Sequence, residues 1–90
     1  MTVYYVEDDE NIRQLVLYAL TQSGIPAEGQ PDDTAFRAAC AKSIPDVVVL
    51  DIMLPDVDGL EILKRIRSTP GKFSRVPVMM VTAKNSELDI

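Results

Sequence analysis

The sequence contains no histidine and a single cysteine, Cys40, and these two shortages exclude several kinds of chemistry. Without histidine there is no imidazole base, no triad built on one, and little prospect of a transition-metal site. One cysteine permits neither an internal disulfide nor a cysteine metal cluster, so Cys40 is expected to be a buried small hydrophobe. This cysteine usage suits a reducing compartment, and we expect the chain to be cytoplasmic.

Long apolar runs and basic residues are also scarce. No stretch approaches the roughly 18 apolar residues that a membrane helix needs, and the start of the chain lacks the features of a signal peptide. Nine basic residues against fourteen acidic ones give a net charge of -5, the wrong sign for binding nucleic acid. The 90 residues allow one domain with a modest core. We therefore expect a soluble domain with no membrane contact and no direct nucleic-acid contact.

The apolar residues that are present alternate between strand and helix patterns. Strands are predicted at residues 3–6, 47–51 and 76–81, with a short edge strand at 25–30, and helices at about 9–23, 31–43 and 59–68. Residues 69–72 are expected to form a loop, and residues 85–90 have the composition of a helix start. This order predicts a parallel sheet with helices on both faces and right-handed crossovers.

Polar residues end three of the four predicted strands: Glu7 and Asp8, then Asp51, then Thr82. The carboxyl ends of parallel strands lie at one edge of a sheet, where open α/β proteins bind their ligands. Carboxylates gathered there repel one another unless protons or a cation offset the charge. Oxygen ligands without histidine or cysteine favour Mg²⁺ over zinc.

Each of these residues has a simpler explanation when it is taken alone. Acidic residues 7–10 complement the positive end of the following helix, Asp51 is suited to turning the chain or capping a neighbour, and Thr82 is an ordinary turn hydroxyl. Their common position at the strand ends favours function instead. The segment from Asp56 to Gly59 superficially resembles a calcium loop or a phosphatase nucleophile motif, but neither pattern fits, and loop geometry and helix capping explain Asp56 and Asp58.

With histidine absent, the remaining candidate nucleophile is a carboxylate. Attack by an aspartate on a phosphoryl group gives an acyl phosphate, and catalysis then depends on positioning and charge neutralisation. A metal ion and a hydroxyl donor would supply both. Asp51 is the candidate nucleophile, and Thr82 is the candidate hydroxyl donor.

Three stretches together resemble the receiver domain of two-component response regulators. They are Val6 to Asp9, Val48 to Gly59 with its D-x-x-L-P-x-x-D-G pattern, and Val78 to Lys84. The resemblance implies that Asp51 is the phosphoacceptor and that Thr82 is the switch hydroxyl. It also implies that Glu7 and Asp8 form an acidic pair, and that Asp8, Asp51 and the backbone carbonyl of Met53 bind Mg²⁺ directly.

The family fold is flavodoxin-like, a doubly wound sheet with strand order 2-1-3-4-5. Similar receivers continue through a fourth helix, a fifth strand that carries a phosphoryl-binding lysine, and a fifth helix. Because this sequence stops at Ile90, we expect an α/β receiver over residues 1–90 with order 2-1-3-4, incomplete at its C-terminus. Lys84 does not occupy the position of the family lysine. Missing cover should leave apolar surface exposed, so we also expect self-association.

The resemblance implies a sensor histidine kinase as the phosphoryl donor and a DNA-binding output domain outside this sequence, as in many transcription regulators. The first hypothesis is a phosphorylation switch, which is not an enzyme in its own right. Two alternatives remain open. One is a pseudo-receiver that acts by contact alone, and the other is a small Mg²⁺-dependent phosphatase.

Overall fold

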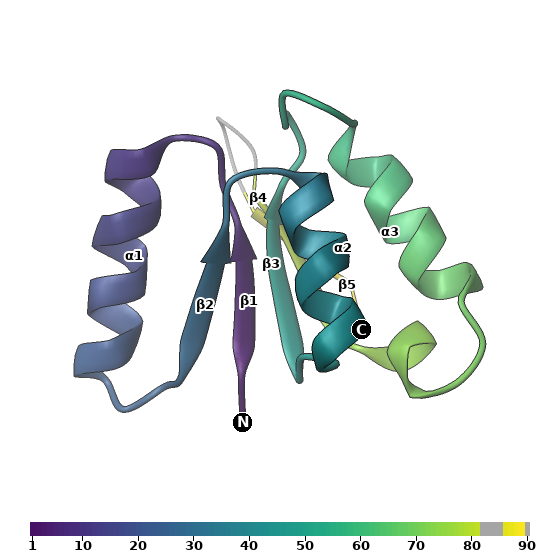
Figure 1. Ribbon diagram of the computed structural model, residues 1–90, viewed down its shortest axis with the longest axis horizontal. Helices are drawn as coiled ribbons and strands as arrows, with labels where there is room; N and C mark the ends of the chain where they lie inside the picture. Colours follow the sequence, from purple (N-terminus) through teal and green to yellow (C-terminus); the bar gives the residue numbers. More distant parts are fainter. Residues whose placement is uncertain (82–85, 90) are drawn as a thin grey trace.

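The computed structural model describes residues 1–81 and the backbone of residues 86–89, and its elements form one five-stranded sheet flanked by helices (Figure 1). The strands are β1 (Val3–Val6), β2 (Ala27–Gln30), β3 (Val47–Asp51), β4 (Val78–Val81) and β5 (Ser86–Asp89). The helices are α1 (Glu10–Gln22), α2 (Asp33–Lys42), α3 (Gly59–Ser68) and a short 3₁₀ helix, η1 (Lys72–Arg75). The strand order in the sheet is β2-β1-β3-β4-β5.

The first four strands are parallel, and the flavodoxin-like order 2-1-3-4 is confirmed. Val6 lies opposite Gln30 on one side and Leu50 on the other, so β1 and β2 end level with each other and β3 ends one residue further along, at Asp51. Each crossover carries a helix, because parallel neighbours require a long connection. The register therefore brings the carboxyl ends of the central strands together.

The tail of the chain differs from the prediction, since residues 86–89 form a strand rather than a helix start. β5 pairs with β4 in the antiparallel direction, with Val81 opposite Ser86. The sheet thus has a fifth strand where none was expected. Only four residues separate β4 from β5, too few for the crossover of a dozen or more residues that a parallel strand needs. The unpaired edge of β4 supplies the pairing partner.

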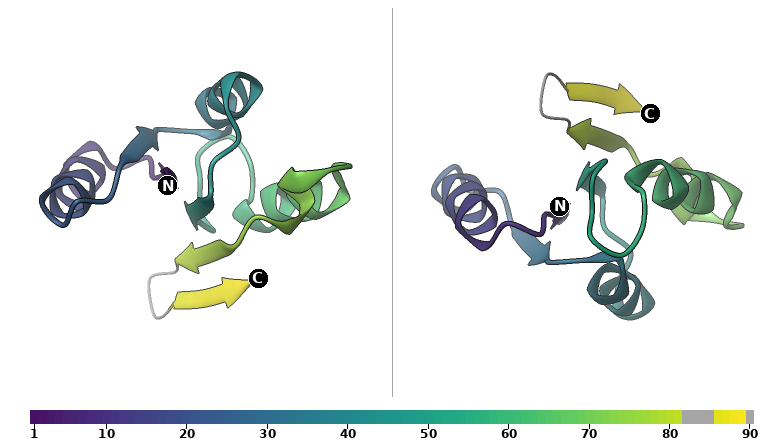
Figure 2. Two further views of the ribbon diagram at one scale, coloured as in Figure 1. Left: turned by 90° about the horizontal axis from the view of Figure 1, so that it is seen from below. Right: turned by 90° about the horizontal axis from the view of Figure 1, so that it is seen from above.

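The helices divide unequally between the two faces of the sheet. Both views of Figure 2 show α1 on one face and α2 and α3 on the other. The main core lies under α2 and α3, where Tyr4, Phe36, Leu50, Ile62 and Ile66 are nearly inaccessible to solvent. No residue of α1 is buried. The sheet therefore has one well-covered face and one face with little cover.

An aspartate precedes each of the three α-helices as its N-cap, and its side chain accepts a hydrogen bond from a backbone N–H in the first turn. Asp9 accepts from Ile12 N–H, Asp32 from Ala35 N–H and Asp58 from Leu60 N–H, the usual role of an N-cap carboxylate. Gly24 follows α1 with a φ of 79°, the left-handed conformation expected at a helix end.

Two details around α3 are not evident from the sequence pattern. Leu60 is apolar, but it lies in the first turn of α3 and 46% of the residue is exposed. The predicted loop at residues 69–72 is confirmed for 69–71, and η1 begins at Lys72, with the Ser74 hydroxyl donating to the Gly71 carbonyl at 2.8 Å. Such local side-chain to backbone bonds stabilise a single turn without any apolar periodicity. The sequence pattern gave no sign of this turn for that reason.

Candidate functional site

Glu7, Asp8 and Asp51 form an acidic cluster at the carboxyl edge of the sheet. Glu7 and Asp8 directly follow β1, and Asp51 is the last residue of β3. One carboxylate oxygen from each lies within 4.8 Å of the others. The parallel register of β1 and β3 thus brings together side chains that are more than forty positions apart in the sequence.

Glu7 is the buried member of the cluster, with 7% of its surface exposed. Its carboxylate accepts hydrogen bonds from the Tyr5 hydroxyl at 3.3 Å and from the Asp9 N–H at 3.1 Å. Burial raises the pKa of Glu7, and although the Asp9 bond opposes this shift, the nearby charge of Asp51 adds to it. The negative charge on Glu7 is therefore unfavourable by itself, and a bound cation would relieve it.

Asp51 is half-buried, and the loop that follows it determines its orientation. Its Oδ1 accepts a hydrogen bond from the Met53 N–H at 3.0 Å, which leaves Oδ2 for a metal ion or for attack on a phosphoryl group. The Gly59 N–H donates to the Ile52 carbonyl at 2.7 Å. A Cβ at Gly59 would lie 2.5 Å from the main-chain oxygen of Asp51. Glycine therefore allows α3 to begin against the end of β3.

A hollow of about 370 Å³ adjoins the acidic cluster. It is lined by Asp8, Ile52, Met53, Leu54, Pro55 and Asp58. Its volume lies within the roughly 300–1,000 Å³ of small-molecule pockets, so one carboxylate of the cluster, that of Asp8, borders a space large enough for a small molecule.

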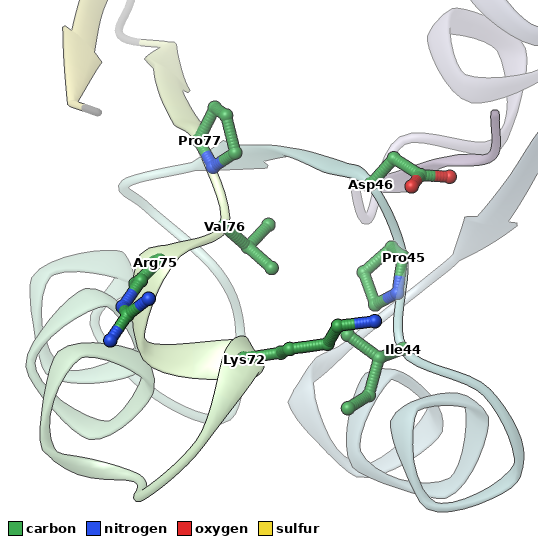
Figure 3. A pocket seen from close by; sticks show the side chains of 7 residues that line it. All are labelled: Ile44, Pro45, Asp46, Lys72, Arg75, Val76 and Pro77. Atoms are coloured by element: carbon green, nitrogen blue, oxygen red, sulfur yellow. The ribbon is translucent and has the colours of Figure 1, made fainter.

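A second hollow, of about 280 Å³, lies at the opposite edge of the sheet, where the segments before β3 and β4 meet (Figure 3). In Figure 3 the Lys72 side chain extends toward Ile44 and Pro45. Asp46 is the acidic residue in its lining, and its carboxylate already accepts the Thr2 N–H at 2.7 Å. A single engaged carboxylate makes this hollow a poor metal site compared with the acidic cluster.

The donors of the acidic cluster fit a hard divalent cation. All three ligand atoms are carboxylate oxygens, the type that Mg²⁺ prefers. Carboxylate oxygens within 4.8 Å of one another are near enough to serve a single ion together after side-chain adjustment. The exposed position of Asp8 leaves room for water ligands, which Mg²⁺ usually retains.

The structure brings together three of the predicted site residues, Glu7, Asp8 and Asp51. Thr82 and Lys84 lie outside the described residues. The role of Thr82 as the switch hydroxyl therefore stays a prediction. The prediction that capping explains Asp58 is confirmed by its bond to Leu60 N–H at 2.8 Å.

Sequence reasoning missed two residues that support Glu7. The Arg13 guanidinium donates to the Glu7 main-chain carbonyl at 2.7 Å, and the Tyr5 hydroxyl donates to its side chain. Burial and the adjacent Glu7 charge raise the pKa of Tyr5 to about 12, which keeps this hydroxyl protonated as a donor. Tyr5 and Glu7 are two positions apart and so share one face of the strand, a signal that the sequence did contain.

None of the helices within the described residues combines the length and the apolar character needed to cross a bilayer. The fold and the acidic cluster together define an α/β protein whose site lies at the carboxyl edge of a doubly wound sheet. The family model described as response regulator receiver domain matches residues 3–90. The chain belongs to this family.

Curated relatives support the assignment. The probable transcriptional regulatory protein TcrX of Mycobacterium tuberculosis is 39% identical over 90 residues, covering 99% of this chain and 37% of the relative. The alkaline phosphatase synthesis transcriptional regulatory protein PhoP of Bacillus subtilis is 36% identical over 87 residues, covering 97% of this chain and 35% of the relative. The chain thus spans about a third of the length of these transcriptional regulators.

Solved structures agree with the fold. The N-terminal domain of a response regulator receiver protein from Methanoculleus marisnigri superposes with a TM-score of 0.85 at 32% identity, covering 92% of this chain and 67% of that one. The response regulator TrrA of Thermotoga maritima, solved in complex with Mg²⁺-BeF, gives a TM-score of 0.81 at 26% identity, covering 91% and 69% of the two chains. The receiver architecture therefore extends over most of the chain.

Proposed function

We propose that this chain accepts a phosphoryl group on Asp51 in a Mg²⁺-dependent reaction and that it acts as a phosphorylation switch. The observation that carries the proposal is the convergence of Glu7, Asp8 and Asp51 within 4.8 Å beside an open hollow. Family membership and the Mg²⁺ present in the TrrA complex support the same reading.

In the proposed reaction, a carboxylate oxygen of Asp51 attacks the phosphorus of a phosphohistidine on a sensor histidine kinase. The new P–O bond forms as the P–N bond breaks, and the departing imidazole takes up a proton. Glu7, Asp8, Asp51 and the backbone carbonyl of Met53 are the groups we assign to the ion. Mg²⁺ would neutralise charge on the transferring phosphoryl oxygens, which is the main requirement of such transfers.

We assign Thr82 the role of switch hydroxyl, a hydrogen-bond donor to the phosphoryl group on Asp51. Its movement would change a surface that a partner reads. The relatives are transcriptional regulators about three times as long as this chain, so we propose a DNA-binding output domain in the whole protein and a cytoplasmic site of action. The exposed apolar residues of α1 also lead us to propose self-association of this chain.

The test is intact mass spectrometry after incubation with Mg²⁺ and a small phosphodonor such as acetyl phosphate. We expect one added phosphoryl group, absent from Asp51→Asn and from samples with excess chelator. Asp46→Asn, at the opposite edge of the sheet, is the matched control and should still be modified. No adduct on the wild type would favour a module that acts by contact alone, and sustained release of phosphate would favour a phosphatase.

A further inference from the structure

The loop between β3 and α3, residues 52–58, is closed at its base by backbone hydrogen bonds. The Gly59 N–H donates to the Ile52 carbonyl at 2.7 Å, and Met53 and Asp58 form an isolated antiparallel bridge. These bonds hold the two ends of the loop together. They leave its middle, around Pro55 and Asp56, to be fixed by something else.

Asp56 in the middle of this loop reaches across to the first turn of α2. Its Oδ1 accepts the Asp33 N–H at 3.2 Å, and its Oδ2 accepts the Thr34 N–H at 3.3 Å and the Thr34 hydroxyl at 3.4 Å. Desolvation opposes ionisation of Asp56, but the combined hydrogen bonds outweigh it and lower the pKa. The carboxylate is therefore charged at neutral pH, as the positive end of a helix favours.

The turn that Asp56 contacts is itself fixed to the rest of the fold. Asp33 is 6% exposed and forms a two-pronged ion pair with the Arg65 guanidinium of α3, at 2.6 and 3.0 Å. Asp32 caps the same helix through the Ala35 N–H at 2.8 Å. Asp56 thus connects the loop to an anchored point, which makes its hydrogen bonds a restraint on the loop.

The same loop carries one wall of the candidate site. Met53 donates its N–H to Asp51 Oδ1 at 3.0 Å, and Ile52, Met53, Leu54 and Pro55 line the hollow beside Asp8. Asp56 is not part of that lining and its side chain points to α2 instead. A restraint at Asp56 therefore acts on the geometry around Asp51 without touching the acidic cluster.

We infer that Asp56 is a positioning residue, which fastens the loop of residues 52–58 to α2 and thereby holds the Met53 main chain in place for the divalent ion. The ion-binding part of this inference rests on the proposed function. Partners that orient metal ligands are commonly worth about 10-fold or more in metal affinity, so we expect an effect of about that size when the restraint is removed.

The experiment compares Asp56→Ala with Asp56→Asn. Alanine removes both the charge and the acceptors, whereas asparagine removes the charge but keeps one carbonyl oxygen. Glu61→Gln, on the exposed surface of α3, removes one negative charge without touching α2 and controls for long-range attraction of the ion. Mg²⁺ affinity is measured by calorimetry, and amide hydrogen exchange of residues 33, 34, 52–54, 56 and 57 is measured without any metal.

We expect Asp56→Ala to weaken Mg²⁺ binding about 10-fold and to speed exchange at those amides, with Asp56→Asn affected less and Glu61→Gln least. Equal affinities for the two Asp56 variants with unchanged exchange would show a charge effect alone and would overturn the inference. If the wild type binds no Mg²⁺, the proposed function fails, but the exchange comparison still decides whether Asp56 restrains the loop. Should Asp56→Ala fail to fold, Thr34→Val replaces it, because it removes one of the three hydrogen bonds and should speed exchange by a smaller factor.

Discussion

At Gly59 the start of α3 lies very close to the backbone at the end of β3, beside the acidic cluster. A Cβ there would lie 2.5 Å from the Asp51 main-chain oxygen and 2.7 Å from the Ile52 Cα. Backbone atoms cannot rotate away, so Gly59→Ala should lower the free energy of unfolding by about 1–3 kcal/mol, the usual range for overpacking. Urea unfolding measures this loss.

Gly29→Ala in β2 is the matched control for this substitution. Its Cβ would meet Leu17 Cδ1 at 2.7 Å and Arg13 side-chain atoms at 3.0 Å. The Leu17 atom is the end of a flexible side chain, and the Arg13 atoms are side-chain rather than backbone atoms and lie further away, so we expect a smaller loss than for Gly59→Ala. Equal losses at the two glycines would contradict the explanation from backbone crowding.

Cys40 provides a prediction about pH. Burial raises the pKa of its thiol from 9.0 to about 11, with Arg65 opposing the shift and Asp33 adding to it. The thiolate is the reactive form, so at pH 8 the folded chain should react with iodoacetamide about 100-fold more slowly than the chain in denaturant, because two pKa units separate the two states. Comparable rates in the two states would show that the thiol is not protected.

The raised pKa of Cys40 also makes the free energy of unfolding depend on pH. The unfolded chain loses the Cys40 proton near pH 9 and the folded chain near pH 11, so the unfolded state binds fewer protons between these values. The Cys40 contribution to stability is therefore intact below pH 9 and declines as the pH rises toward 11. A Cys40→Ala variant should lack this part of the decline in urea unfolding.

Site residues could be predicted from the sequence where they lie at, or just after, the end of a strand that the apolar pattern reveals. Glu7, Asp8 and Asp51 were found because the parallel order placed the ends of β1 and β3 at one edge. Arg13 was not found, because its bond to the Glu7 carbonyl depends on how α1 packs beside β1. A contact to a main-chain atom leaves no pattern in the sequence.

The ion pair between Asp33 and Arg65 joins α2 to α3 directly. Asp33 is almost fully buried, and 32% of the Arg65 side chain is exposed. Removing one partner of a buried pair costs about 3–5 kcal/mol, but partial exposure of Arg65 screens this pair. We therefore expect Arg65→Met to lower the free energy of unfolding by about 1–3 kcal/mol in urea unfolding.

A double substitution separates the ion pair from simple loss of packing. Asp33→Asn removes the charge that Arg65→Met leaves buried, so the double variant should recover part of the stability lost by Arg65→Met alone. Arg37→Met, on the exposed side of α2, is the control and should change stability by less than about 0.5 kcal/mol. Strict additivity of Asp33→Asn and Arg65→Met would show that the two side chains do not interact.

Helices and central strands could be predicted because their signals are local. Apolar periodicity and the aspartate caps gave α1, α2 and α3 to within a few residues. β5 could not be predicted in this way, since the composition of residues 86–89 favours a helix start and the pairing with β4 decides the outcome. Tertiary pairing commonly overrides propensity in such short segments.

Cover over the two faces of the sheet is uneven, and this affects how copies of the chain interact. α1 leaves Leu15 at 68% and Tyr18 at 64% exposure, with Ile12 at 47% on the same helix. Residues three and four apart share one helix face, so these side chains form a contiguous apolar strip, Ile12, Leu15 and Tyr18. Contiguous apolar patches on a protein surface commonly mark interaction sites, and the expected self-association stays a prediction.

We therefore expect the chain to self-associate through the apolar strip of α1, at micromolar to millimolar concentrations. Leu15→Lys combined with Tyr18→Lys should shift sedimentation velocity profiles toward the monomer, because charged side chains would lose their hydration in the contact. Ala38→Lys, at an exposed position of α2 on the other face of the sheet, adds a positive charge away from the strip and should leave association unchanged. A wild-type chain that sediments as a folded monomer at millimolar concentration would contradict this expectation. Association that survives the double substitution would instead place the contact elsewhere, with the edge of the sheet as the next surface to test.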